Sequence, residues 1–204
     1  STVNQKVKPE KEIANVNPVI TPKMKNRKEA LELLKQYVEN DNLLQHCMMV
    51  AQAMEAYAKE LGKSQEIIEQ WWQAGLLHDI DWEKYPDEHP HKAVNEILPE
   101  HKFSKEVIEA VKSHAPERTG KEPETEIERY LFACDELSGF MNAVSLMRPY
   151  KFEDMKVNSV TKKLKDQRFA ANVPREDIQK GAELIGKSLQ EHIRFMIQVY
   201  QKGG

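Results

Sequence analysis

Apolar residues recur every three or four positions along most of the chain, the spacing that places side chains on one face of an α-helix. This pattern predicts helices over about residues 28–38, 41–61 and 64–77. In the second half of the chain it predicts further helices over 104–114 and 125–147. No segment alternates apolar and polar residues long enough to predict a β-strand. The hydrophobic pattern therefore predicts an all-α fold.

Helix-starting and helix-ending residues punctuate the same pattern. Asp41 and Ser64 stand where N-caps are expected, because each has a short polar side chain just before an apolar periodic segment. Gly62 follows the second segment, and glycine commonly ends helices. Pro90 suits a first helical position and opens a short helix that we expect to reach Leu98.

Composition divides the 204 residues into three parts. Residues 1–25 are polar, contain three prolines and show no periodicity, which predicts a flexible tail. Residues 26–150 hold the helices above, which we expect to form one domain with a substantial core. Residues 151–204 predict two or three more helices that extend this domain and pack on it.

The overall charge argues against two kinds of partner. The chain has 30 Lys and Arg against 33 Asp and Glu, a net charge of −3, which favours neither a nucleic acid polymer nor a membrane surface. No apolar run approaches the roughly 20 residues of a membrane span. Cys47 and Cys134 lie in apolar helical patterns, so we expect buried free thiols. These features predict a cytoplasmic protein.

Several polar residues fall on the apolar sides of predicted helices. His46 shares a face with leucine and valine, and the pair His78-Asp79 ends an apolar helix. Asp135 follows Leu131 by four positions, so its carboxylate points to the apolar side. A lone inward histidine is usually a hydrogen-bonded core residue, but an unpaired buried carboxylate is costly. A metal ion bound between the helices satisfies all four groups together.

The order of His46, His78-Asp79 and Asp135 resembles the H…HD…D motif of the HD-domain metal-dependent phosphohydrolase superfamily. A closer similarity, to a subgroup of predicted HD hydrolases, is carried by LLHDIDWEKYPDEHP, DELSGF and NSVTKKLKDQRFAANVPRED. The resemblance implies an HD-domain helical bundle with a C-terminal helical extension. It also implies a divalent cofactor, namely Mn, Fe, Ni, Co, Zn or Mg.

The superfamily contains members with one ion and members with two, and the second ion needs two more histidines. His89 and His114 stand at suitable places between the HD pair and the last aspartate, with His91 as a second choice for the role of His89. Alternatively, His89 is an N-cap or a surface loop residue. The resemblance implies one ion and leaves a second open. His192, on the last predicted helix, is expected to serve packing.

Catalytic and substrate-binding candidates follow from the same resemblance. Asp79 would bridge two ions where both are present, and either Asp81 or Glu136 would accept the proton of a water molecule. The alternatives are that Asp81 caps a turn and that Glu136 is a solvated neighbour. Phosphate binding needs cations. The basic residues that follow the long helix are candidates, or form a solvated surface: Arg148, Lys162, Lys163, Lys165, Arg168 and Arg175.

These features together predict a metal-dependent phosphohydrolase. Its expected substrate is a small phosphorylated metabolite, such as a nucleotide or a related phosphoester. Two alternatives remain: a di-iron oxygenase of the same fold, and an HD module that senses a metal or ligand without turnover. The sequence leaves the native metal, the substrate and the oligomeric state open, with a dimer as one option.

Overall fold

The computed structural model describes residues 25–203 of the chain. The flexible tail expected for residues 1–25 thus lies, except for Lys25, outside the described residues. The described part contains helices and no strands, so the predicted all-α fold is confirmed. In this part, no helix is long and apolar enough to cross a membrane.

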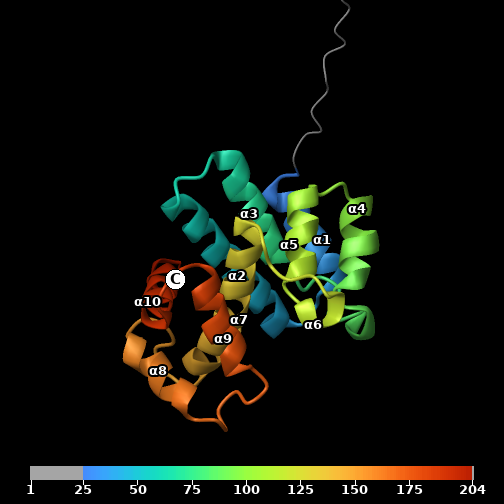
Figure 1. The fold of residues 1–204 in the computed structure, drawn as a ribbon. Helices are drawn as coiled ribbons and strands as arrows, with labels where there is room; N and C mark the ends of the chain where they lie inside the picture. Colours follow the sequence, from blue (N-terminus) through green and yellow to red (C-terminus); the bar gives the residue numbers. More distant parts are fainter. Residues whose placement is uncertain (1–24, 204) are drawn as a thin grey trace, which may run out of the picture.

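Ten α-helices form in the described residues (Figure 1). They are α1 (Arg27–Tyr37), α2 (Asp41–Glu60), α3 (Gln65–Leu77), α4 (Leu98–Glu100), α5 (Lys105–Ser113), α6 (Pro116–Thr119), α7 (Glu126–Leu146), α8 (Val157–Lys165), α9 (Arg175–Leu184) and α10 (Leu189–Lys202). Between α3 and α4 lie a 3₁₀ turn, η1 (Pro86–Glu88), and a π-helical turn, η2 (Ala93–Ile97).

The starts of α2 and α3 can be compared with the sequence patterns, and that of α2 needs a correction. Ser64 caps α3 by accepting the backbone N–H of Ile67, as expected. The N-cap of α2 is Asn40 rather than Asp41, because the Asn40 side chain accepts the N–H of Leu43. Asp41 is instead the first helical residue, where a negative charge also favours the helix N-terminus.

Three helices form the centre of the molecule. Helix α2 packs along α3, and both contact α7. Helices α1 and α5 pack against α3 on one side, while α8, α9 and α10 gather on the other side, around α7 and α2 (Figure 1). Cys47 and Cys134 are buried free thiols in this core, as predicted. The arrangement places the inward faces of α2, α3 and α7 close together.

A glycine allows the closest of these contacts. A Cβ atom at Gly75 of α3 would lie 2.8 Å from backbone atoms of Ala51 and Val50 in α2. The two helices therefore approach at a position where only glycine fits. This contact brings the end of α3, with His78, alongside His46 of α2.

Helix α10 is tied to the central helices by buried polar contacts. His192 is fully buried, its Nδ1 lies 2.6 Å from the Tyr57 hydroxyl, and its Nε2 lies 3.0 Å from the carbonyl oxygen of Ala133. The Tyr200 hydroxyl donates to the carbonyl oxygen of Met49. His192 thus serves packing, as the sequence predicted.

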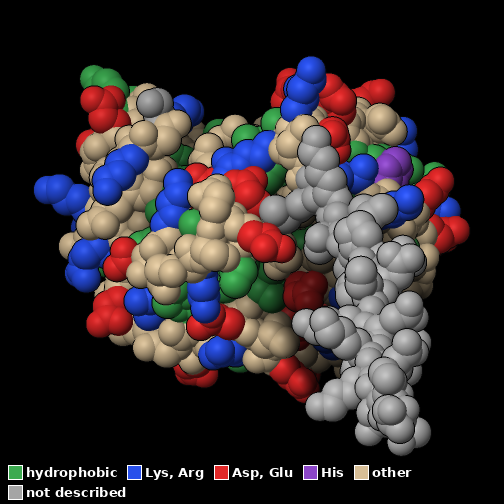
Figure 2. Space-filling view, turned by 90° about the horizontal axis from the view of Figure 1, so that it is seen from above, with side chains coloured by type: hydrophobic (Ala, Val, Ile, Leu, Met, Phe, Trp, Pro, Cys, Tyr) green, Lys and Arg blue, Asp and Glu red, His purple; other side chains and the backbone are tan. Residues whose placement is uncertain are grey.

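The visible surface carries both signs of charge. Figure 2 shows Lys and Arg side chains interspersed with Asp and Glu over the face that it presents. This mixture agrees with the small net charge of −3.

Candidate metal centre

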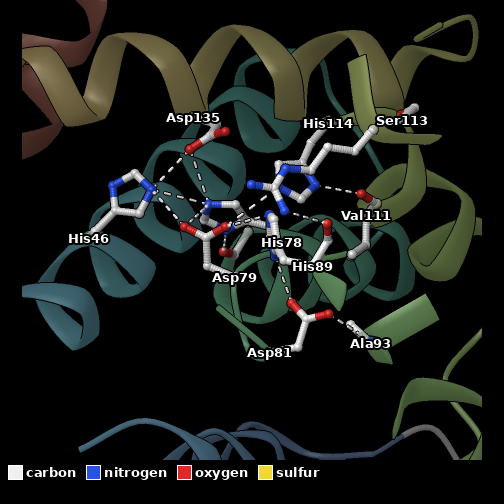
Figure 3. A network of polar contacts seen from close by, with 12 residues as sticks. His46, His78, Asp79, Asp81, His89, Ala93, Val111, Ser113, His114 and Asp135 are labelled. Atoms are coloured by element: carbon white, nitrogen blue, oxygen red, sulfur yellow. Dashed lines mark hydrogen bonds and ion pairs between the residues drawn. The ribbon is translucent and has the colours of Figure 1, made fainter. Parts of the chain in front are cut away.

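Four candidate ligands meet where α2, α3 and α7 come together (Figure 3). His46 lies on α2, His78 and Asp79 follow directly on α3, and Asp135 lies on α7. His46 Nε2 is 3.1 Å from His78 Nε2 and 2.9 Å from Asp135 Oδ1. One donor atom of each residue lies within 4.8 Å of the others. The structure therefore brings together the four groups that the sequence predicted to share a metal ion.

A second group of donors shares Asp79 with the first. Its other members are His89, which follows η1, and His114 at the end of α5. Asp79 Oδ1 lies 3.5 Å from the Nε2 atoms of both His89 and His114. Asp79 Oδ2 lies 3.2 Å from His78 Nε2, in the first group. Each carboxylate oxygen of Asp79 thus faces one group.

The structure distinguishes between His89 and His91, the two alternatives for one ligand of the second ion. His89 is buried and faces Asp79, whereas His91 is exposed. His91 Nε2 lies 3.2 Å from the backbone carbonyl oxygen of Arg118, which directs the ring away from the donor groups. His89 is therefore the residue that completes the second group.

Hydrogen bonds at Nδ1 set the tautomer of three of the four imidazoles. His78 Nδ1 donates to the carbonyl oxygen of Gly75 at 2.6 Å, and His114 Nδ1 donates to that of Val111. His89 Nδ1 lies 2.6 Å from the Asp81 carboxylate. Carbonyl and carboxylate oxygens accept hydrogen bonds, so each ring carries its proton on Nδ1 and directs the Nε2 lone pair inward.

These orientations fit a bound cation. Lone pairs on nitrogen and anionic carboxylate oxygens would repel one another at about 3 Å unless a positive charge lay between them. Imidazole and carboxylate ligands without a thiolate suit borderline and hard divalent ions, from Mn²⁺ to Zn²⁺, and also Mg²⁺. The residues present therefore fit the divalent ion that the resemblance implies.

Electrostatics at the centre favour positive charge. Burial opposes a charge on His78, but the neighbouring Asp79 and Asp135 outweigh burial and raise the pKa of His78 well above its usual value. Burial also opposes the anionic form of both aspartates, and His78 outweighs it to hold the pKa of each well below the usual range. A metal ion would compete with the proton that these carboxylates attract to His78.

Asp81 does not face the donor groups. It is fully buried, with Oδ1 on His89 Nδ1 and Oδ2 accepting the backbone N–H of Ala93 at 2.9 Å. Both oxygens are thus occupied on the far side of the His89 ring. The expectation that Asp81 accepts the proton of a water molecule is wrong. Asp81 instead orients His89 and holds the start of η2.

An open pocket of about 260 Å³ lies over the donor groups. Glu136 lines this pocket beside Asp135 and is partly buried, so the alternative of a solvated neighbour does not describe it. Burial, followed by the charges of Asp135 and Asp177, raises the pKa of Glu136 to about 9. A cation bound nearby would lower that pKa again.

The expected substrate-binding cations lie elsewhere. Arg148 pairs with Asp154, and the Arg175 guanidinium donates to backbone carbonyl oxygens of the segment joining α8 and α9, such as that of Ala170. Among the described residues that line the pocket, none comes from this set, and its role in substrate binding stays a prediction. The residues concerned are Arg148, Lys162, Lys163, Lys165, Arg168 and Arg175.

The residues that line the pocket include some that were not predicted from the sequence. Arg118 on α6 and Trp82, which is 43 % exposed, both line the pocket. Arg118 stands four positions after His114 in HAPERTG, and Trp82 stands three after Asp79. Closeness in sequence to a predicted ligand was the available signal for both.

Comparison with protein-family models matches residues 43–139 to the HD domain. The matched segment contains both donor groups. Over this segment the chain is similar to the HD domain. No curated protein and no solved structure gave a match. The HD superfamily consists largely of metal-dependent phosphohydrolases, and its members bind divalent metals, in agreement with the His and Asp groups of this chain.

Proposed function

We propose that this HD domain is a phosphohydrolase that uses two divalent metal ions. One ion binds between His46, His78, Asp79 and Asp135, and the second binds between Asp79, His89 and His114. The observation that carries the proposal is the position of Asp79, whose two oxygens face different histidine pairs. A carboxylate with one oxygen toward each donor group would contribute a ligand to both ions.

The reaction is hydrolysis of a phosphoester. Ions held at the two sites supply positive charge beside a phosphoryl oxygen and lower the pKa of water. A bond forms between the water oxygen and phosphorus while the ester P–O bond breaks, and the products are an alcohol and the phosphate or phosphomonoester that keeps the phosphorus. Glu136 lines the pocket and accepts the proton that the water loses, which then passes to the leaving oxygen or to solvent.

The size of the pocket supports a small substrate. Its volume of about 260 Å³ lies just below the range of about 300–1,000 Å³ typical of ligand pockets. A phosphoryl group fits inside, while a larger part of a nucleotide or related phosphoester would extend through the open mouth. We therefore propose a small phosphorylated metabolite as substrate, and neither a nucleic acid polymer nor a membrane as partner.

The rest of the chain would support this site. We propose that residues 26–150 form the catalytic unit and that 151–204 form an extension that stabilises it. The contacts of α10 with α2 and α7 favour this division, since they brace two ligand-bearing helices from outside. The two buried free thiols favour a reducing compartment, so we propose the cytoplasm.

The test combines metal analysis with a substrate screen. The protein is loaded separately with Mn²⁺, Co²⁺, Ni²⁺, Fe²⁺ or Mg²⁺, and phosphate release is measured over a panel of phosphorylated metabolites. We expect release by the wild type and none by Asp79→Ala. His46→Ala and Asp135→Ala should each lower the metal content. Asp41→Ala, an exposed position at the start of α2, is the matched control and should retain both.

The di-iron oxygenase is the alternative that the geometry also favours, because four histidines around a shared carboxylate suit a pair of iron ions. Electron paramagnetic resonance and oxygen consumption separate the two activities. A mixed-valent iron pair with oxygen-dependent turnover, and no phosphate release with any metal, would replace the hydrolase proposal. Metal binding without either activity would indicate a sensing module.

A further inference from the structure

Arg118 is an exposed residue that the surrounding structure holds in place. Its Nη1 donates to the carbonyl oxygen of Pro86 at 2.8 Å and to that of His89 at 3.1 Å. The guanidinium carbon lies 5.3 Å from the centre of the Trp82 ring, a cation–π distance. An exposed arginine usually samples many rotamers, so these three contacts reduce the entropy that ligand binding would cost.

The contacts leave donors available. Arginine carries five N–H donors in a planar fork that matches the geometry of phosphate oxygens. Among the described residues, no hydrogen-bond partner lies at Nε or Nη2 of Arg118, so three donors remain for a ligand. Arg118 also lines the pocket, beside His89 and His114 of the second donor group.

The charge of the pocket makes this arginine significant. The pocket is also lined by Glu117 and Glu136, in addition to the two aspartates of the donor groups. A phosphate monoester carries nearly two negative charges at neutral pH, so these acidic side chains would repel it. Among the described residues, Arg118 is the one Lys or Arg that lines the pocket. A phosphoryl group entering here therefore needs Arg118 in addition to bound metal.

We propose that Arg118 is the anion-binding residue of this pocket and that it recognises the terminal phosphoryl group of a phosphate monoester. The free edge of its guanidinium binds two non-bridging oxygens, and the phosphoryl group lies over the half of the site formed by His89 and His114. This inference rests on the proposed function, whose substrate it narrows from phosphoesters in general to monoesters.

The experiment measures phosphate and metal separately on the full chain. The probes are inorganic phosphate, titrated calorimetrically into Mn²⁺-loaded protein, and para-nitrophenyl phosphate as a monoester substrate. In Arg118→Gln we expect the Kd of phosphate to rise about tenfold or more, as the loss of a charge-assisted hydrogen-bond pair predicts. KM should rise with it. Arg118→Lys keeps the positive charge but loses the planar, two-pronged donor geometry of arginine. Its Kd for phosphate should therefore lie between those of the wild type and Arg118→Gln.

Two controls separate substrate binding from simpler effects. Arg194→Gln removes the same charge from an exposed position on α10 and should leave the Kd of phosphate unchanged. The number of Mn²⁺ ions bound by Arg118→Gln should equal that of the wild type. Loss of a metal equivalent in parallel with phosphate would overturn the proposal, because Arg118 would then act only by holding the His89 backbone.

The remaining outcomes distinguish this inference from the function on which it rests. If the wild type hydrolyses monoesters and Arg118→Gln has unchanged KM and phosphate affinity, the anion site is wrong while the hydrolase stands. If the wild type binds phosphate through Arg118 but cleaves no phosphoester, the hydrolase is wrong while the anion site stands.

Discussion

Acid should weaken the fold through His192, a residue outside the metal centre. The ring is fully buried between α10, α2 and α7, where it accepts from the Tyr57 hydroxyl and donates to the Ala133 carbonyl oxygen. Burial lowers the pKa of His192 from 6.5 to about 4, the bond to Ala133 opposes this, and Lys187 adds to it. The folded protein therefore keeps His192 neutral in a range where the unfolded chain protonates it.

The sign and size of the effect follow from proton linkage. Above pH 6.5 the ring is neutral in both states, and its contribution to the free energy of unfolding is fully present. As the pH falls from 6.5 towards 4, the unfolded chain gains a proton that the folded protein does not bind. Linkage then gives a loss of about 2 kcal/mol at pH 5 and about 3 kcal/mol at pH 4.

Urea unfolding measures this loss directly. The free energy of unfolding is determined between pH 8 and pH 5 for the wild type and for His192→Gln, which keeps an amide near the same partners but does not titrate. Protonation of the metal centre affects both proteins alike, so it cancels in the difference. We expect the wild-type advantage over the variant to shrink by about 2 kcal/mol from pH 8 to pH 5.

A matched variant guards against a general effect of losing a histidine. His101→Gln removes a partly exposed histidine that follows α4, and its stability should follow the wild type at every pH. If the difference in the free energy of unfolding between the wild type and His192→Gln stayed constant over this pH range, the reasoning would be refuted. A buried neutral imidazole must make that difference depend on pH.

Three further predictions concern the metal centre and the helix contact behind it. Asp79→Asn should lower the bound Mn²⁺ from two equivalents to one or none, measured by mass spectrometry of metals. Asp81→Asn should lower the affinity of the second metal site about 10–100-fold in a metal titration, because it disturbs the orientation of the ligand His89. The affinity of the first site should not change. Gly75→Ala should cost about 1–3 kcal/mol in urea unfolding, because its Cβ meets the backbone of Ala51. Gly139→Ala, whose Cβ meets only a ring atom at 3.9 Å, should not destabilise, and an equal loss in both variants would contradict this account.

The fold was predictable because periodicity reports directly on which side chains are buried. The long helix expected over 125–147 is α7, Glu126–Leu146, with Thr125 as its cap. The π-helical form of η2 was not predicted, because the sequence indicated only a short helix opened by Pro90. The hydrogen bond from the Ala93 N–H to Asp81 at the start of η2 was not predictable either, since local sequence does not encode that partner.

The donor groups were predictable for a related reason, because polar side chains on apolar helix faces require partners. The cations were not predictable. Arg175 stands in a basic segment, yet its guanidinium is occupied by backbone carbonyl oxygens such as that of Ala170, which only the folded loop brings to it. Arg118 lies on a four-residue helix with no periodic pattern, so its closeness in sequence to His114 was the one signal for its place at the pocket.

The pair His78-Asp79 works because α3 ends at that point. The last carbonyl groups of a helix lack intrahelical partners, and Gly75 offers one of them to His78 Nδ1, three residues later. His114 repeats the arrangement at the end of α5, where Val111 is the acceptor. Each C-cap histidine thus satisfies a helix end and fixes its own tautomer with one bond. Asp79 follows the C-cap His78 and lies outside the helix. Its carboxylate can therefore lie between the two histidine pairs, a position that it would not reach if the helix continued.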